Sequence, residues 1–417
     1  MKRFFLNSAM LILTTGFWFG CDDAESLEPY RNQVFIKLFG GTGSEEGNDF
    51  LQMNDDGFII VGSTTSYDEG DKDVFIVKTD SVGNKQWTRR YGDQFDNLAR
   101  SVILSSDNNS IIICGETQRE NDRRDILLIE LDLNGNLINQ QNHGRAEWDE
   151  FGVDIIEAIS DGYLIVGNNV DLGNNPDSAY IYLLEVDENL QAKPNRDRPL
   201  VGDRAFFNEG ASAMIYNDLN YLCFGTSQKG GGSAPDGNEN FYLFRILEQG
   251  NETGSPQFFG SNLREYGTSF TKVSGGYLLA GYQINGNRNI PYVVKVDGNL
   301  NFVWERVLDV TYNNASISRE PTSVIQTNDG GFLLLMKSLV QPYGSEIGLM
   351  KLNFTGDQIE WETSFGSQNN DLTGSVIQLS DDYFILCGSL GFGEENNTEI
   401  NKMGLIKANP TGELVPL

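Results

Sequence analysis

The chain has 417 residues and a formal net charge of −29 at pH 7, and its acidic residues are scattered along the sequence rather than grouped. Such a surface repels phosphate backbones, which excludes nucleic acid as a partner. Glycine (46), phenylalanine (25) and tyrosine (16) are abundant, proline is scarce (11), and no convincing amphipathic helix is present, so the composition favours short strands joined by tight turns.

The N-terminus carries a predicted signal peptide. Lys2 and Arg3 precede an apolar run that ends at Gly20, and this basic-then-apolar order predicts a secretory signal over residues 1–20. A run of this length that contains Asn7 is marginal as a membrane span.

Cys21 follows the apolar run directly and precedes two aspartates. This arrangement resembles the signal of bacterial lipoproteins, and the acidic pair resembles the surface-export signal of the Bacteroidota type, whereas Trp18 and Phe19 depart from the usual lipobox. The resemblance implies a lipidated Cys21, a linker over residues 21–33, and an outer-membrane lipoprotein that is exposed at the cell surface or faces the periplasm. The alternatives are an uncleaved anchor and an ordinary signal peptide.

Seven copies of one two-strand pattern follow from residue 34 onward. An apolar strand ending near glycine reads GFIIVG (57–62), SIIICG (110–115), GYLIVG (162–167), NYLCFG (220–225), GYLLAG (276–281), GFLLLM (331–336) and DYFILCG (382–388). A second apolar strand, such as DVFIVKTD (73–80), follows each of them and ends near Asp or Asn. The copies recur every ~54 residues, a period typical of a blade of four strands, so the sequence predicts an all-β, seven-bladed β-propeller over residues 34–417.

The first copy predicts four strands, at 48–53, 57–64, 73–80 and 84–92. The second of these is apolar on consecutive residues, so both of its faces must be buried, as stacked blades allow. Residues 34–40 look like a fourth strand with no first three strands before it. We therefore expect this N-terminal strand to complete the seventh blade and close the ring, with the C-terminal tail as the competing candidate.

Three tryptophans, Trp87, Trp304 and Trp361, share one place in the fourth strand, after an Asp or Asn and then a Gly. This spacing resembles the tryptophan-docking motif of quinoprotein-type propellers, which implies an indole wedged between neighbouring blades. The match is partial, because Asn139 replaces Trp in the second copy. The adjacent cysteine pair of the quinoprotein cofactor site is missing as well, so no cofactor is predicted.

Other conspicuous side chains are expected to pack inside the fold. The fourth strand often ends in an aromatic residue followed by glycine, and His143, the only histidine, occupies that aromatic place. Cys114, Cys223 and Cys387 lie in the second strands of copies that are not adjacent in a ring of seven. We expect buried thiols there, too far apart for disulfides, rather than metal ligands.

The connections divide between two faces of the ring. Turns from the first to the second strand and from the third to the fourth are short and share one face, which we call the short-turn face. The other connections, such as 65–73, 227–240 and 308–320, are long and variable and share the opposite, long-loop face. Because binding residues tend to lie on variable loops held by a rigid scaffold, the long-loop face is the candidate working surface.

Each of the seven copies has an acidic residue near the start of its innermost strand: Glu46, Asp96, Glu150, Glu209, Glu265, Glu320 and Asp371. In a closed ring these residues would form an acidic girdle at the mouth of the central channel, able to bind a cation such as Ca²⁺ or a basic group. The alternative is that each carboxylate accepts hydrogen bonds from loop backbone.

The usual catalytic patterns are missing from the sequence, which has no G-x-S-x-G, no H-E-x-x-H and no phosphate loop. We therefore expect a monomeric, non-catalytic module, held at the membrane by its lipid, that binds a glycan or a protein partner through the long-loop face. The alternative is a polysaccharide-active hydrolase or lyase that uses carboxylates of the same face.

Overall fold

The computed structural model describes residues 33–414, except 67–71, 121, 171–178, 202–207, 229–238, 249, 313–314, 341–343, 368 and 396–397. These described residues contain many strands and no helix, and hence no helix long and apolar enough to cross a membrane. The predicted signal peptide and Cys21 lie outside the described residues.

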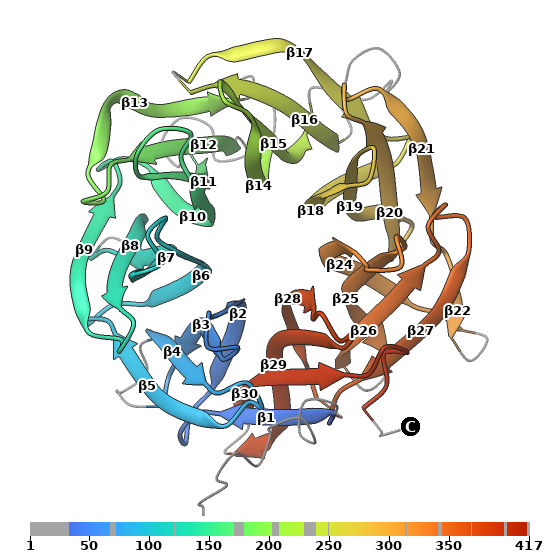
Figure 1. Cartoon of the computed structure of the whole chain (residues 1–417), viewed down its shortest axis with the longest axis horizontal. Helices are drawn as coiled ribbons and strands as arrows, with labels where there is room; N and C mark the ends of the chain where they lie inside the picture. The colour runs from blue at the N-terminus through green and yellow to red at the C-terminus, as the bar shows by residue number, and fades with distance from the viewer. Residues whose placement is uncertain are drawn as a thin grey trace, which may run out of the picture.

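Seven four-stranded antiparallel sheets stand around a common axis, which confirms the predicted seven-bladed β-propeller (Figure 1). Blade 1 contains β2 (Glu45–Gln52), β3 (Phe58–Thr64), β4 (Asp73–Thr79) and β5 (Lys85–Tyr91). Blade 2 contains β6 (Asn97–Leu104), β7 (Ser110–Gln118), β8 (Arg124–Asp132) and β9 (Leu137–His143). Blade 3 contains β10 (Asp149–Glu157), β11 (Tyr163–Val170), β12 (Ala179–Val186) and β13 (Ala192–Val201). Blade 4 contains β14 (Asn208–Asn217), β15 (Asn220–Ser227), β16 (Asn240–Leu247) and β17 (Glu252–Phe259). Blade 5 contains β18 (Arg264–Val273), β19 (Gly276–Asn285), β20 (Arg288–Asp297) and β21 (Phe302–Val307). Blade 6 contains β24 (Ser318–Gln326), β25 (Phe332–Val340), β26 (Gly344–Leu352) and β27 (Ile359–Phe365). A small hairpin of β22 (Thr311–Tyr312) and β23 (Ala315–Ser316) lies between blades 5 and 6.

The N-terminal strand closes the ring, as the sequence predicts. Blade 7 consists of β28 (Leu372–Gln378), β29 (Phe384–Glu395), β30 (Thr398–Ala408) and, as its outermost strand, β1 (Phe35–Phe39). β1 pairs antiparallel with β30, so strands from the two ends of the chain share one sheet. The competing C-terminal tail instead packs Leu414 against the apolar core between blades 6 and 7.

β3, the second strand of blade 1, shows how the blades stack. All seven of its residues are buried. Phe58 and Ile60 pack against blade 7, whereas Ile59 and Val61 pack against blade 2. Successive side chains of a strand point to opposite faces of the sheet, so a strand that lies between two neighbouring sheets must be apolar throughout.

The tryptophans of the outermost strands dock against the next blade, as the sequence pattern predicts. A β-carbon added to Gly135 would lie 2.8 Å from the indole of Trp87, so only glycine lets the turn between β8 and β9 seat on that ring. The same contact recurs in two further pairs, Trp304 with Gly356 and Trp361 with Gly412.

The other conspicuous side chains pack inside the fold, which confirms the prediction for them. Cys114, Cys223 and Cys387 are buried free thiols, and burial raises the pKa of Cys387 to about 12. The imidazole Nε2 of His143 lies 2.8 Å from the carbonyl oxygen of Leu190, so this side chain joins blade 2 to blade 3.

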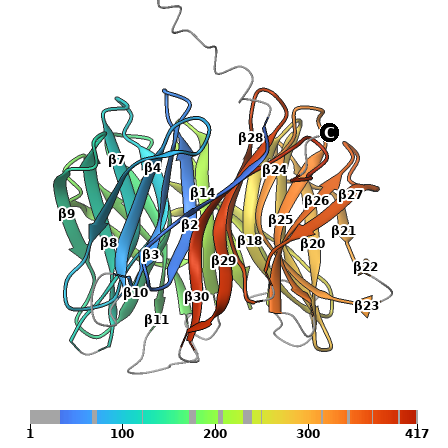
Figure 2. The same cartoon turned by 90° about the horizontal axis from the view of Figure 1, so that it is seen from below.

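Both ends of the described chain lie at the short-turn face of the ring. The chain enters the propeller at the short-turn face, because Phe35, at the start of β1, pairs with Lys407 close to the tight turn between Asn409 and Gly412. The described chain also ends at that face (Figure 2). The innermost strands begin at the opposite, long-loop face.

Candidate functional site

The seven acidic residues of the predicted girdle do not share one register position. One position lies just before Gly47 or its counterpart in each innermost strand, and it holds Glu46, Glu209 and Glu320. The position one residue earlier holds Glu150, Glu265 and Asp371, and Asp96 lies one residue earlier still. Because successive strand side chains point to opposite faces, a shift of one residue separates the carboxylates into two sets with different surroundings.

The position two residues before Gly47 or its counterpart, which we call the buried position, carries a polar side chain in every blade. Each is at most 2% exposed: Glu45, Asn97, Glu150, Asn208, Glu265, Arg319 and Asp371. Glu45 accepts a hydrogen bond from the Thr64 hydroxyl at 3.0 Å and pairs with Lys402 at 2.8 Å. Asp371 accepts the amide of Gly391 at 2.8 Å. These groups fasten the connections between blades, which is the alternative that the sequence left open for a carboxylate here.

Glycines at the ends of the outermost strands make room for these buried carboxylates. A β-carbon on Gly366 would lie 2.1 Å from Oδ2 of Asp371, and one on Gly260 would lie 2.6 Å from Oε2 of Glu265. Glu265 accepts the amide and the hydroxyl of Ser261 through Oε1, while its Oε2 has no hydrogen-bond partner among the described residues. Burial raises the pKa of Glu265 to about 7.

The position directly before Gly47 or its counterpart, which we call the channel position, faces the central channel. It holds seven residues of mixed chemistry, none of them fully buried: Glu46, Leu98, Phe151, Glu209, Tyr266, Glu320 and Leu372. Glu46 pairs with Lys72 at 3.0 Å, and the backbone amide of Lys72 in turn donates to Asp96 at 2.8 Å. The girdle is therefore interrupted by apolar and aromatic side chains.

A β-bulge at the same place in the innermost strands turns a further set of side chains into the channel. In blade 1 the pairing with β3 shifts between Gly47 and Asp49, which leaves Asn48 as the extra residue. The corresponding residues of blades 2 to 6 are Arg100, Val153, Ala211, Thr268 and Thr322. All six line one cavity, as expected of bulges, which re-aim side chains.

The residue after the bulge ties neighbouring blades together beneath this cavity. Asp49 of blade 1 accepts the Ser375 hydroxyl of blade 7 at 2.6 Å and the Val102 amide of blade 2 at 3.0 Å. Burial raises the pKa of Asp49 to about 6. The innermost strands are thus held in fixed relative positions by side chains as well as by the outer blades.

The cavity has a volume of ≈ 420 Å³, and apart from Tyr282 it is lined by residues in or near the first half of the innermost strands, which begin at the long-loop face. Its walls combine the six bulge residues with Glu209, Gly210, Tyr266, Gly267 and Tyr282. The volume falls within the range of about 300–1,000 Å³ that is typical of small-molecule sites.

Tyr266 and Tyr282 form the aromatic wall of the cavity. They are direct cross-strand partners on β18 and β19, with ring centroids 5.3 Å apart and planes inclined by 20°. Arg264 lies 5.5 Å from the Tyr266 ring and donates to its hydroxyl, and Glu239 holds Arg264 through two bonds of 2.6 Å. Burial raises the pKa of Tyr266 to about 12, so its hydroxyl stays neutral at physiological pH.

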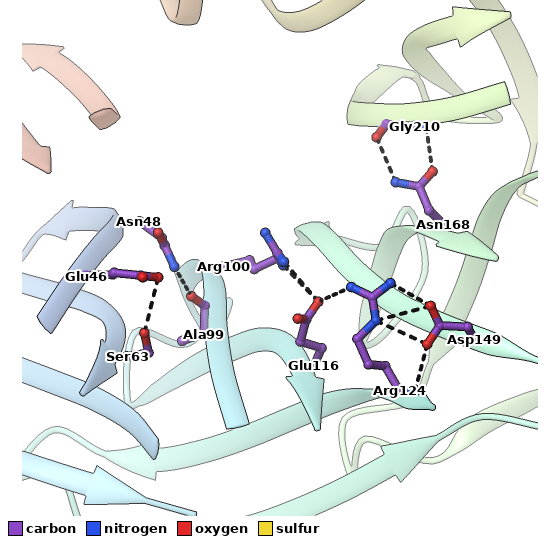
Figure 3. A network of polar contacts seen from close by, with 10 residues as sticks. All are labelled: Glu46, Asn48, Ser63, Ala99, Arg100, Glu116, Arg124, Asp149, Asn168 and Gly210. Carbon is purple, nitrogen blue, oxygen red and sulfur yellow. Dashed lines mark hydrogen bonds and ion pairs between the residues drawn. The ribbon is translucent and has the colours of Figure 1, made fainter. Parts of the chain in front are cut away.

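Arg100 enters the channel from the other side, on β6 of blade 2. Its Nε and Nη2 donate to one oxygen of Glu116 at 3.1 and 3.0 Å (Figure 3). Arg124 forms ion pairs with the same Glu116 carboxylate, at 3.4 Å, and with Asp149, at 2.6 Å. The Arg124 guanidinium also lies 4.1 Å from the centre of the Phe151 ring. The cations of this wall therefore already face carboxylates.

Glu209 and Glu320 differ from Glu46, the third carboxylate at the channel position, because neither forms an ion pair with a described residue. Glu320 accepts one hydrogen bond, from Asn289 at 2.6 Å. Glu209 is exposed to the channel, yet the surrounding walls dehydrate it and raise its pKa, against the opposing effect of Arg100. Burial raises the pKa of Tyr282, and the negative charges of Glu320 and Glu209 raise it further. In the sheet register, Glu209 and Glu320 occupy channel positions of blades 4 and 6, on either side of the blade that carries the tyrosine pair.

The described part of the chain contains no group of three or more His, Cys, Asp or Glu side chains placed to hold a metal ion.

The sequence pattern identified the glutamates of the channel but missed the tyrosine pair and the bulge residues. A signal was present, since Tyr266 directly precedes Gly267 and Tyr282 directly follows Gly281, at mirrored places around two paired glycines.

No protein-family model matches the chain, and no curated protein is similar to it in sequence. Among solved structures, the α-L-arabinanase of Penicillium chrysogenum complexed with arabinobiose is similar in fold, with a TM-score of 0.50 and 13% identity over 74% of this chain and 92% of that chain. The β-propeller domain of the Trilobed protease from Pyrococcus furiosus gives a TM-score of 0.45 and 12% identity over 90% of this chain and 97% of that chain. Likeness at this identity shows the fold alone, so the chain is a seven-bladed β-propeller whose role must be inferred from its site.

Proposed function

We propose that the protein is a non-catalytic, glycan-binding β-propeller of the outer membrane, whose ligand enters the channel cavity from the long-loop face. One observation carries this proposal, the stacked pair of Tyr266 and Tyr282 in the wall of a cavity of ≈ 420 Å³. Sugar rings present apolar C–H faces that pack on aromatic rings and hydroxyl edges that need hydrogen-bond partners.

The polar lining of the cavity suits the hydroxyl edges of a sugar. Asn48, Thr268 and Thr322 supply an amide and two hydroxyls, and Glu209 supplies a carboxylate acceptor. The Asn48 amide donates to a backbone carbonyl at 2.7 Å, and the Thr268 hydroxyl donates to another at 2.7 Å. Side chains fixed in this way lose little conformational freedom when a ligand binds.

The position of β1 supports an orientation on the membrane. Because the chain enters the propeller at the short-turn face, an anchor at Cys21 would turn the long-loop face and its cavity away from the membrane (Figure 2). Metabolic labelling with an alkyne fatty acid should mark the wild type and leave Cys21→Ala unmarked. Equal labelling of the two proteins would contradict the anchor.

A glycan array probed with the full-length protein in detergent tests the binding function. We expect Tyr282→Ala to lower the affinity for the bound saccharide about tenfold or more, because the aromatic wall is lost. Phe354→Ala is the matched control, since this ring is 69% exposed in a turn of the short-turn face. Absence of any saccharide ligand, or equal loss in the two variants, would overturn the proposal.

The second candidate function is that of a polysaccharide-active enzyme, and one observation favours it. Glu209 is a channel carboxyl group with a raised pKa, which is what a general acid requires. An enzyme of this kind would release reducing ends or unsaturated products from a polysaccharide, and Glu209→Gln would abolish the release. A saccharide that binds in the cavity and stays intact on long incubation supports the binding function instead.

A further inference from the structure

If the cavity binds a glycan, as proposed above, the charges in its wall select which glycan it accepts. The cations that border the cavity are already neutralised by neighbouring acids. Arg100 donates twice to Glu116, and Arg264 donates twice to Glu239. These guanidinium groups therefore offer little net positive charge to an anionic ligand.

Two carboxylates differ from these paired groups, Glu209 in the wall of the cavity and Glu320 at the channel position of blade 6. Among the described residues, neither Glu209 nor Glu320 forms an ion pair, although Arg100 acts against the raised pKa of Glu209 and Lys337 lies opposite Glu320 in the register of β24 and β25. The two carboxylates occupy the channel positions of blades 4 and 6. Blade 5 lies between these two blades, and it contributes Tyr266 and Tyr282. The blade that carries the tyrosine pair thus stands between two blades whose channel carboxylates are not held in an ion pair.

Such an arrangement is costly without a ligand and favourable with a positively charged one. A carboxylate in a narrow channel is partly dehydrated, and the loss of hydration is offset when an opposite charge approaches it. Aromatic rings add to this preference, because their faces attract cations. The net charge of −29 also raises the local concentration of cations and repels polyanions.

We propose that the glycan carries an unacetylated amino group, and that the sugar bearing this group enters the cavity with its ammonium between Glu209 and Glu320, beside the tyrosine pair. The ring hydroxyls of that sugar then meet Asn48 and the threonine hydroxyls of the bulges. A lysine side chain carries the same ammonium, but its apolar stem would leave those polar groups unmatched.

Binding of oligosaccharides by the full-length protein, measured by calorimetry, tests this inference. The probes are a trimer of glucosamine, the same trimer with every amine acetylated, a neutral glucose trimer and a lysine-containing peptide. We expect the glucosamine trimer to bind at least tenfold more tightly than its acetylated form, and this advantage to shrink as salt is added.

Variants locate the ammonium within the protein. Glu209→Gln and Glu320→Gln should each remove most of the advantage of the free amine, so that the free-amine and the acetylated trimers bind with similar affinity. Glu188→Gln is the matched control, because Glu188 is an exposed glutamate in a short turn at the opposite face. The melting temperature of each variant shows that the fold is retained.

The possible outcomes separate this inference from the proposed function. Equal binding of acetylated, neutral and free-amine trimers overturns the amino-group inference and leaves the glycan-binding function standing. Failure of every saccharide on the array and in calorimetry overturns both. Binding of the peptide alone, with the same dependence on Glu209, overturns the glycan and assigns the ammonium to a protein partner.

Discussion

The buried position and the channel position of the innermost strands are adjacent in sequence and opposite in role. Glu45 and Glu46 are neighbouring residues of the same type, yet Glu45 is fully buried against Lys402 while Glu46 faces the channel and pairs with Lys72. The alternation of strand side chains is sufficient to produce this difference.

The comparison teaches that a carboxylate at this end of a propeller has two distinct uses. At the buried position it holds the connections between blades, and polar side chains of other types, such as Asn208 and Arg319, occupy the same place. At the channel position the side chain is free to meet a ligand, and its chemistry varies from blade to blade. Substitutions at the two positions should therefore change different measured quantities.

The largest effect is expected at the buried position of blade 1. Glu45→Ala removes the partner of Lys402 and leaves that ammonium without its carboxylate inside the closing blade. We expect a loss of about 3 kcal/mol in the free energy of unfolding, measured by urea denaturation. A loss below about 1 kcal/mol would show that the buried carboxylates do not hold the ring.

The pH dependence of stability sharpens the comparison at Glu265. Its pKa in the folded protein, about 7, lies above the ordinary value of 4.5, so the unfolded chain releases this proton first as the pH rises. The contribution of Glu265 to stability is therefore complete below pH 4.5 and is lost as the pH rises through 7.

Glu265→Gln should remove this dependence, which is on the order of 3 kcal/mol across the window. Urea denaturation at a series of pH values between 4 and 8 measures it. The curve of the variant should be flatter than that of the wild type, and parallel curves would argue against a proton held by Glu265.

A double-mutant cycle tests the room that glycine makes for a buried carboxylate. Gly366→Ala should cost about 2 kcal/mol, because the new β-carbon would displace the Asp371 side chain. In the background of Asp371→Ala the same change should cost at least 1 kcal/mol less. Gly298→Ala is the control, since nothing lies within 4 Å of its added β-carbon. Strictly additive effects of the two changes would contradict the contact.

The smallest effect on stability is expected at the channel position. Glu46→Gln should change the free energy of unfolding by less than about 0.5 kcal/mol, because its ion pair with Lys72 is partly exposed. Thermal denaturation of this variant beside Glu45→Ala compares two neighbouring glutamates directly. Comparable losses in the two variants would remove the distinction between the positions.

The sequence predicted the architecture well because the blade pattern is repeated seven times. The consecutive apolar residues of β3, the tryptophan spacing and the isolated N-terminal strand each had a physical reading that the structure confirms. Each of these features depends on local chemistry or on a period, and both can be read from one sequence.

The site could be predicted only in part, because it depends on register. Glu150 and Glu209 look equivalent as acids near a strand start, and only the pairing with the next strand shows that they point to opposite sides. The bulge that turns Arg100 and Thr268 into the channel has no reliable signature in sequence. A cavity built from six blades depends on contacts between residues far apart along the chain, which periodicity does not reveal.

Closure by β1 also decides how the molecule carries mechanical load. β1 is both the outermost strand of blade 7 and the described strand nearest to the proposed lipid anchor. A pulling force between the membrane and a ligand held in the channel would load the hydrogen bonds that pair β1 with β30. This pairing runs from Phe35 opposite Lys407 to Phe39 opposite Met403. Because the chain enters at the short-turn face, this force acts along the strand and strains its hydrogen bonds together rather than peeling them one at a time.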